Sequence, residues 1–167
     1  MNKVYQTALE MCRYMAGDKM RINHFMKVHA YAKIIGEAEE LDARTLEILE
    51  TAAYTHDIGI KLSEQKYNSA SGYYQQIEGP AEAEKLLTPL GFDNELIERV
   101  KYLISRHHKY ANIDGADCQI LIEADFIVNA CEEDMPQDTI KSIYDKIFKT
   151  EAGKKIMRSL FPAALPE

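Results

Sequence analysis

Four ionisable residues lie on stretches whose pattern is otherwise that of a buried helix face: His24, His56, His107 and Asp125. Burying an unpaired carboxylate is costly, so an aspartate on such a face needs a cation or several hydrogen-bond donors. Neutral imidazoles and carboxylates are ligands for Fe, Mn, Co, Ni and Zn. A metal ion bound between helices, each supplying one ligand, would explain all four positions together.

Each of these positions also has an ordinary structural interpretation. A lone histidine on a helix face is more often a core or rim residue than a ligand. His107, His108 and Lys109 could be cations that complement the C-terminal end of a helix. Asp125 would be exposed if the helical phase were shifted by one residue.

The elements that must position these residues are helices, because apolar residues recur with helical spacing almost throughout the chain. Asp42, Asp93 and Thr150 fit helix N-caps, and Gly59 fits the end of the helix that carries His56. No strand-like alternation, internal repeat or domain linker is visible. We therefore expect an all-α bundle of seven or eight helices, with apolar faces at residues 4–15, 24–35, 46–56, 80–91, 97–104, 118–128, 140–147 and 150–161.

Residues 61–77 are polar, aperiodic and rich in tyrosine, which predicts a long loop at the active site. Tyr67, Tyr73 and Tyr74 could stack on a nucleobase or close a lid, or they could anchor the loop on the core. The next helix is expected to begin at Pro80, since proline suits a first-turn position. Residues 163–167 are expected to form a frayed tail.

Composition narrows the class of protein. A chain of 167 residues with 46% apolar residues fits one domain, residues 1–167, with a core of its own. No apolar run is long enough to span a membrane, and the N-terminus lacks the pattern of a signal peptide. Three cysteines without a CxxC spacing predict buried free thiols in a reducing cytoplasm.

The net charge of −7 disfavours binding to duplex nucleic acid, whose affinity depends on cations that meet phosphates. It does not exclude a small anionic substrate, because metal ions can dominate the charge inside a cleft. The sequence does not indicate the oligomeric state.

Three segments resemble one family in their order along the chain. AAYTHDIGIK carries the doublet His56-Asp57, HFMKVHAYA places His24 rather than His29 as the first histidine, and ILIEADFIVNA supplies Asp125. Together they are similar to the HD-domain superfamily of metal-dependent phosphohydrolases, with a motif core at residues 24–125. The resemblance implies a metal site formed by these four residues.

The doublet has a physical rationale. Neighbouring side chains on a helix point about 100° apart, so both reach one ion only where the helix ends. Gly59 places that end directly after Asp57. His56 would bind as a neutral imidazole, and the two oxygens of Asp57 could bridge two ions or hold a water.

Members of the family with two ions add histidines between the doublet and the last aspartate. RHHKY matches the later of these additions, through His107 and His108, but Glu78 stands where an earlier histidine is usual. Glu78 could be a ligand of a second ion, an acid or base beside a single ion, or a carboxylate that complements a helix N-terminus.

The resemblance implies hydrolysis of a small nucleotide or related phosphate ester. One or two divalent ions (Mn, Fe, Co, Ni or Zn, with Mg also allowed) would polarise a phosphoryl oxygen and lower the pKa of bound water toward about 7. Asp57 would position that water. Lys61, Arg106 and Lys109 could neutralise phosphate charge or be solvated surface cations.

Two other functions are compatible with the same motif. Some HD-like proteins with two irons are oxygenases, and their ligand sets resemble those of the hydrolases. The second alternative function is that of a regulatory module that binds a nucleotide or a metal. Neither the acidic pair of the stringent-response hydrolases nor the GYP signature of cyclic-dinucleotide phosphodiesterases occurs here.

Overall fold

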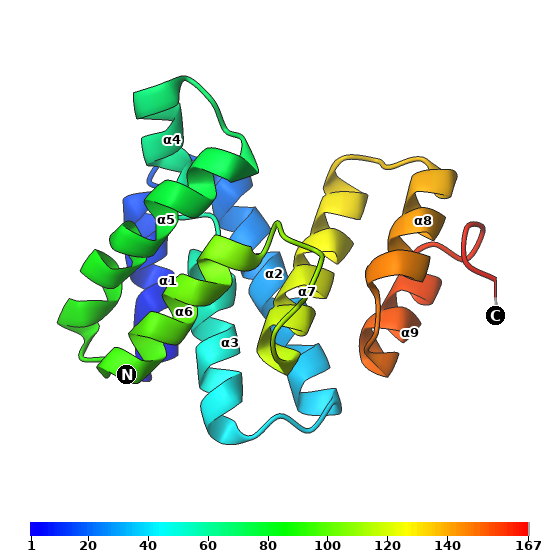
Figure 1. Cartoon of the computed structure of the whole chain (residues 1–167), viewed down its shortest axis with the longest axis horizontal. Coiled ribbons are helices and arrows are strands. Elements are labelled where there is room, and N and C mark those ends of the chain that lie inside the picture. The colour runs from blue at the N-terminus through cyan, green and yellow to red at the C-terminus, as the bar shows by residue number, and fades with distance from the viewer. Residues whose placement is uncertain (167) are drawn as a thin grey trace.

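The computed structural model describes residues 1–166 and contains, in that part of the chain, nine α-helices, one 3-10 helix and no strand (Figure 1). The predicted all-α class is confirmed. The elements are α1 (Lys3–Tyr14), α2 (Lys19–Ala38), α3 (Ala43–Thr55), α4 (Ile60–Tyr67), α5 (Gly72–Leu87), η1 (Thr88–Leu90), α6 (Asn94–Arg106), α7 (Ala116–Glu132), α8 (Gln137–Ile147) and α9 (Glu151–Leu160).

The three predicted N-caps are confirmed. The carboxylate of Asp42 accepts hydrogen bonds from the first turn of α3, that of Asp93 accepts one at α6, and the Thr150 hydroxyl accepts one at α9. Asp18 caps α2 in the same way, by accepting from the backbone N–H of Arg21. Each cap satisfies a backbone donor that the helix itself leaves free.

Residues 61–77 are not the long loop that their polarity predicted. They contain α4 and the start of α5, separated only by a short link, and this adds one helix to the expected seven or eight. Asn68 ends α4 in the left-handed conformation, with φ of 50°. Helix α5 begins at Gly72, so Pro80 lies inside it rather than at its first turn.

Helices α4 and α5 are positioned by contacts that hydrophobic periodicity cannot predict. A Cβ on Gly59 would lie 2.5 Å from the backbone oxygen of Gln75 and 2.7 Å from the backbone nitrogen of Gly79. Only glycine allows this close approach between the turn after α3 and α5. Tyr67 and Tyr74 stack on each other, with ring centroids 4.0 Å apart, so these two tyrosines join α4 to α5.

The central layer consists of α2, α3 and α7, with α1, α4, α5 and α6 on one side and α8 and α9 on the other (Figure 1). The core between these helices is formed by fully buried aliphatic side chains that include Val28, Ile35, Leu49, Val100, Ile104, Leu121 and Ile122. The central layer therefore provides rigid backbone on which polar side chains can be held in place.

The C-terminal helices are attached to α7 through a buried carboxylate. Glu123 accepts hydrogen bonds from the backbone N–H groups of Lys149 and Thr150, at 2.7 and 3.0 Å. Residues 163–166 do not form the predicted frayed tail, because the N–H of Leu165 bonds to the oxygen of Phe161 and the Leu165 side chain is buried. Residue 167 of the expected tail lies outside the described residues.

The cysteines differ in their exposure. Cys118 is buried, Cys12 is half-buried and Cys131 is exposed, so the prediction of three buried thiols holds for only one of them. The apolar face of α7 turns inward at Cys118, whereas Cys131 lies at its C-terminal end. No helix among residues 1–166 is both long and apolar enough to cross a membrane.

Candidate metal centre

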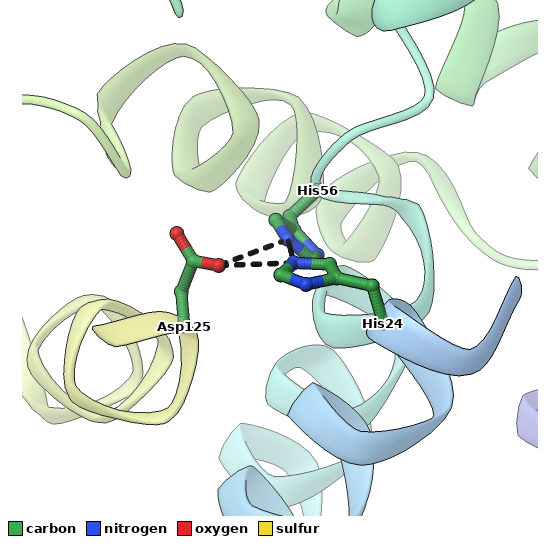
Figure 2. A group of neighbouring side chains, drawn as sticks. All are labelled: His24, His56 and Asp125. Carbon is green, nitrogen blue, oxygen red and sulfur yellow. Dashed lines mark hydrogen bonds and ion pairs between the residues drawn. The ribbon is translucent and has the colours of Figure 1, made fainter. Parts of the chain in front are cut away.

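Three of the predicted ligands converge from three different helices. His24 lies on α2, His56 follows the end of α3, and Asp125 lies in the middle of α7 (Figure 2). The Nε2 atom of His24 is 3.1 Å from Oδ1 of Asp125 and 3.3 Å from Nε2 of His56. The Nε2 atom of His56 is 3.5 Å from the same carboxylate oxygen. The three ligand atoms thus face one common point.

Asp57 links this group to a further histidine. Its Oδ2 lies 3.4 Å from Nε2 of His56 and 3.6 Å from Nε2 of His24. Its Oδ1 lies 3.5 Å from Nε2 of His107, which follows the end of α6. The two oxygens therefore face different histidines, as the geometry of a bridging carboxylate requires.

The ligand atoms form three overlapping groups in which all atoms lie within 4.8 Å of one another. The groups are His24, His56 and Asp125; His56, Asp57 and His107; and His107, His108 and Asp125. Because Asp125 belongs to the first and third groups, the cluster has the donors for two neighbouring ions.

Hydrogen bonds on the opposite side of each ring orient three of the histidines. The Nδ1 atoms of His56 and His107 each lie 2.8 Å from a backbone oxygen, that of Ala53 and Ile104 respectively. The Nδ1 atom of His24 lies 2.9 Å from Oε2 of Glu132. These acceptors require the proton on Nδ1, so the lone pair of Nε2 is directed into the cluster.

Two imidazole nitrogens of the cluster have no hydrogen-bond partner in the described part of the protein. The Nε2 atoms of His107 and His108 are buried and have no hydrogen-bond partner among the described residues. Buried polar atoms are normally paired. Two unpartnered imidazole nitrogens beside carboxylates therefore fit a bound cation.

The carboxylates and imidazoles shift one another's pKa values. Burial lowers the pKa of His24 and His56, but the hydrogen bond to Asp125 and the charge of Asp57 outweigh it and raise both. Burial raises the pKa of Asp57, but the charge of His56 and the contact with His107 hold it well below its ordinary value. The carboxylates of the cluster are therefore ionised near neutral pH, as metal ligands must be.

His108 is held in its neutral form beneath the start of α5. Burial and the neighbouring His107 lower the pKa of His108 to about 4. The two rings lie 3.9 Å apart, and a Cβ on Gly72 would lie 2.6 Å from Cδ2 of His108. The first residue of α5 therefore covers the His108 ring and must be a glycine to do so.

Three residues expected in the site are not brought to the cluster. Glu78 accepts hydrogen bonds from Lys66 at 2.8 Å and from the Tyr67 hydroxyl at 2.7 Å, both on α4. The role proposed for it depended on a helix that begins at Pro80, whereas Glu78 is inside α5 and faces α4.

Lys61 and Arg106 are also directed elsewhere. Lys61 donates to the backbone oxygen of Tyr14 at 2.9 Å and lies over the Tyr14 ring. Arg106 is exposed and lies over Tyr102. His29, which the first-histidine segment sets aside in favour of His24, bonds to Glu50 at 2.8 Å instead.

The structure adds residues that sequence reasoning did not find. The side-chain amide of Asn129 donates to Oδ1 of Asp125 at 3.1 Å, and Glu132 holds His24. Their spacing of four and seven residues after Asp125 places them on the same face of α7, and this was the available signal. Arg21 lies one helical turn before His24 on α2.

A cavity of about 380 Å³ gives access to the cluster through His24 and Asp57. Its other lining residues are Asp18, Met20, Arg21, Asn129 and Glu132. Asp57 is 23% exposed, whereas His56 and His107 are fully buried behind it. A ligand in the cavity would therefore meet Asp57 and His24 first.

The family model for the HD domain matches residues 21–149, which include every member of the cluster. No curated protein and no solved structure matches the chain.

Proposed function

The chain belongs to the HD-domain family, and from that premise we propose that it is a metal-dependent phosphohydrolase acting on a small phosphorylated substrate. The observation that carries the proposal is the convergence of imidazole Nε2 atoms on two ionised carboxylates beside an open cavity. Histidine and carboxylate ligands of this kind support metal-assisted hydrolysis.

The first ion would be held by His24, His56, Asp57 and Asp125, and a second by Asp57, His107, His108 and Asp125. A divalent ion such as Mn, Fe, Co, Ni or Zn supplies Lewis-acid polarisation of a phosphoryl oxygen and a lowered pKa for coordinated water.

In this proposal Asp57 orients the attacking water. It is the cluster's most exposed carboxylate, and the neighbouring imidazoles keep it ionised. Asp57 can therefore accept a hydrogen bond from water that enters through the cavity. Asn129 and Glu132 hold Asp125 and His24 in place, so that these two ligands need not reorganise when the substrate binds.

The size of the cavity and the charge of the chain support a small substrate. A volume of about 380 Å³ suits a small molecule better than a polymer. The net charge of −7 would repel a long polyanion everywhere outside the cavity. A nucleotide or a related phosphate ester fits both observations, and duplex nucleic acid fits neither.

One observation favours a second candidate. The two neighbouring donor groups, joined by shared carboxylates, are also what a di-iron oxygenase requires. Oxygen consumption by the reduced, iron-loaded protein in the presence of a substrate, without release of phosphate, would identify that activity instead.

The proposed function is tested by assaying protein purified without chelator. Metal content per chain is measured first, and phosphate release is then followed with a panel of phosphate esters and nucleotides in the presence of Mn, Co, Ni or Mg. Asp57→Asn should abolish turnover. Asp145→Asn, which removes an exposed carboxylate from α8, should not. Turnover that persists in Asp57→Asn, or a chain that binds no metal, would refute the proposal.

A further inference from the structure

Three of the seven residues that line the cavity beside the metal cluster are carboxylates. Asp18, Asp57 and Glu132 all face it, and among the described residues that line it only Arg21 carries a permanent positive charge. Among the charged residues that line the cavity, Arg21 is therefore the one whose charge suits a phosphoryl group.

The guanidinium of Arg21 is held between two helices. Its Nη1 lies 3.0 Å from Oδ2 of Asp18, the residue that caps α2. Its Nη1 and Nη2 also bond to the two oxygens of Glu64 on α4, at 3.1 and 2.5 Å. Glu64 thus occupies the paired N–H donors of the guanidinium in the bidentate arrangement that a phosphate also adopts.

The two carboxylates differ in how easily they can be displaced. Asp18 is fixed by its second role as the N-cap of α2. Glu64 is on the surface, with a side chain that is 43% exposed, and exposed ion pairs contribute little to stability. Asp18 can therefore keep Arg21 at the cavity while Glu64 leaves it.

We propose that Arg21 binds two oxygens of the substrate's phosphoryl group, that Glu64 occupies this position until the substrate displaces it, and that the substrate is a phosphate monoester. This inference rests on the proposed phosphohydrolase function. It makes Arg21 a substrate-binding residue and Glu64 its built-in competitor.

The choice of a monoester follows from counting phosphoryl oxygens. A monoester has three non-bridging oxygens, so two can bond to Arg21 while the third faces the metal ligands. A diester has two non-bridging oxygens, so one of them would have to accept from Arg21 and face the metal ligands at once. The bidentate geometry at Arg21 therefore favours a terminal phosphoryl group, which has an oxygen to spare for the metal ligands.

Binding is measured without turnover, by calorimetric titration of the Mn-loaded protein with inorganic phosphate and, separately, with dimethyl phosphate. Arg21→Gln should weaken phosphate binding about tenfold, the usual effect of losing a hydrogen bond between charged groups. Glu64→Gln should tighten it by about two- to fivefold, since the competing pair is exposed. Dimethyl phosphate should bind weakly and be insensitive to both substitutions.

Two further variants separate charge from geometry. Arg44→Gln removes an arginine that bonds to Glu47 and Asp93, away from the cavity, and should leave phosphate affinity unchanged. Arg21→Lys keeps the charge but not the paired donors, so it should lie between the wild type and Arg21→Gln. Metal content and circular dichroism are measured on every variant, so that a loss of folding is not read as a loss of binding.

The possible results are distinct. If the Mn-loaded wild type bound no phosphate, the proposed phosphohydrolase function would fail. If the wild type bound phosphate and Arg21→Gln and Arg21→Lys bound it equally well, the role of Arg21 would be overturned while the proposed function stood. If Glu64→Gln did not tighten binding, competition by Glu64 would be refuted, and tight, Arg21-dependent binding of dimethyl phosphate would refute the choice of a monoester.

Discussion

His24 and Glu132 are joined across α2 and α7 by a hydrogen bond of 2.9 Å between Nδ1 and Oε2. This bond leaves Nε2 of His24 facing His56 and Asp125, so a residue outside the predicted ligand set orients one of the ligands. Lys27 contacts the other oxygen of Glu132, at 3.0 Å, and helps to hold the carboxylate.

Replacing Glu132 should therefore weaken metal binding without removing a ligand. We expect Glu132→Ala to lower the metal affinity by about tenfold, because carboxylates that orient ligating histidines have effects of this size. Competition with a chromogenic chelator measures the change. Glu133→Ala, at the exposed neighbouring position, is the matched control, and an equal loss in both variants would argue against an orienting role.

The close approach of Gly72 to His108 predicts the sign of a stability change. Gly72→Ala on an ordinary exposed helix would stabilise the protein, since alanine is the better helix former by about 0.5–1 kcal/mol. Here the added methyl group would lie 2.6 Å from the His108 ring, so we expect destabilisation of about 1–3 kcal/mol instead. Urea unfolding measures the difference, and metal analysis should show loss of the second ion before the first.

Glu78 should be dispensable for metal binding. It bonds to Lys66 and Tyr67, and these contacts lower the pKa of its carboxyl group. We expect Glu78→Gln to retain the full metal content and turnover of the wild type, whereas Asp57→Asn loses both. Loss of an ion from Glu78→Gln, measured by elemental analysis, would return Glu78 to the ligand set.

The contrast between Glu78 and Asp125 shows what the sequence could predict. Asp125 lies on a long helix with clear apolar periodicity, so its inward direction followed from the pattern. Glu78 depended on where α5 begins, and that boundary is set by the contact of Gly59 with α5 and by the Tyr67–Tyr74 stack. Contacts between segments distant in the chain leave no periodic signal.

The same limit applies to Arg21 and Lys61. Sequence proximity to the doublet suggested Lys61 as a phosphate-binding residue, but α4 turns its side chain toward Tyr14. Arg21 lies one helical turn before the predicted ligand His24, which was a usable signal, but the packing of α2 beside the turn after α3 is what brings it to the cavity with Asp57.

Metal binding should depend on pH through the histidines of the cluster. The pKa values of His24 and His56 are raised above 6.5 in the folded, metal-free protein, mainly by Asp57 and Asp125 acting against burial. The folded state then holds these protons more tightly than the unfolded chain does. This contribution to stability is complete below pH 6.5 and is lost as the pH rises through the raised pKa values.

The carboxylates act in the opposite direction. The pKa values of Asp57 and Asp125 are lowered below 3.8, so their contribution is present above that pH and is lost as the pH falls through the folded-state values. Taken alone, these four residues should therefore stabilise metal-free protein most between pH 3.8 and 6.5. His108 opposes them as the pH falls below 6.5, because its pKa is lowered to about 4 and the folded state resists its protonation.

A bound ion should reverse the pH dependence of stability above pH 6.5, where the metal-free protein loses stability as the pH rises. The ion requires neutral imidazoles, so loading must release the protons that His24 and His56 hold. We expect the rise in melting temperature on adding Mn²⁺ to be larger at about pH 8 than at about pH 6, because fewer protons then compete with the ion. Thermal melts at both pH values, with and without metal, measure this. Calorimetric titration in two buffers of different ionisation enthalpy measures the protons released, and an ion that bound without proton release at pH 6 would show that the histidines are neutral before loading.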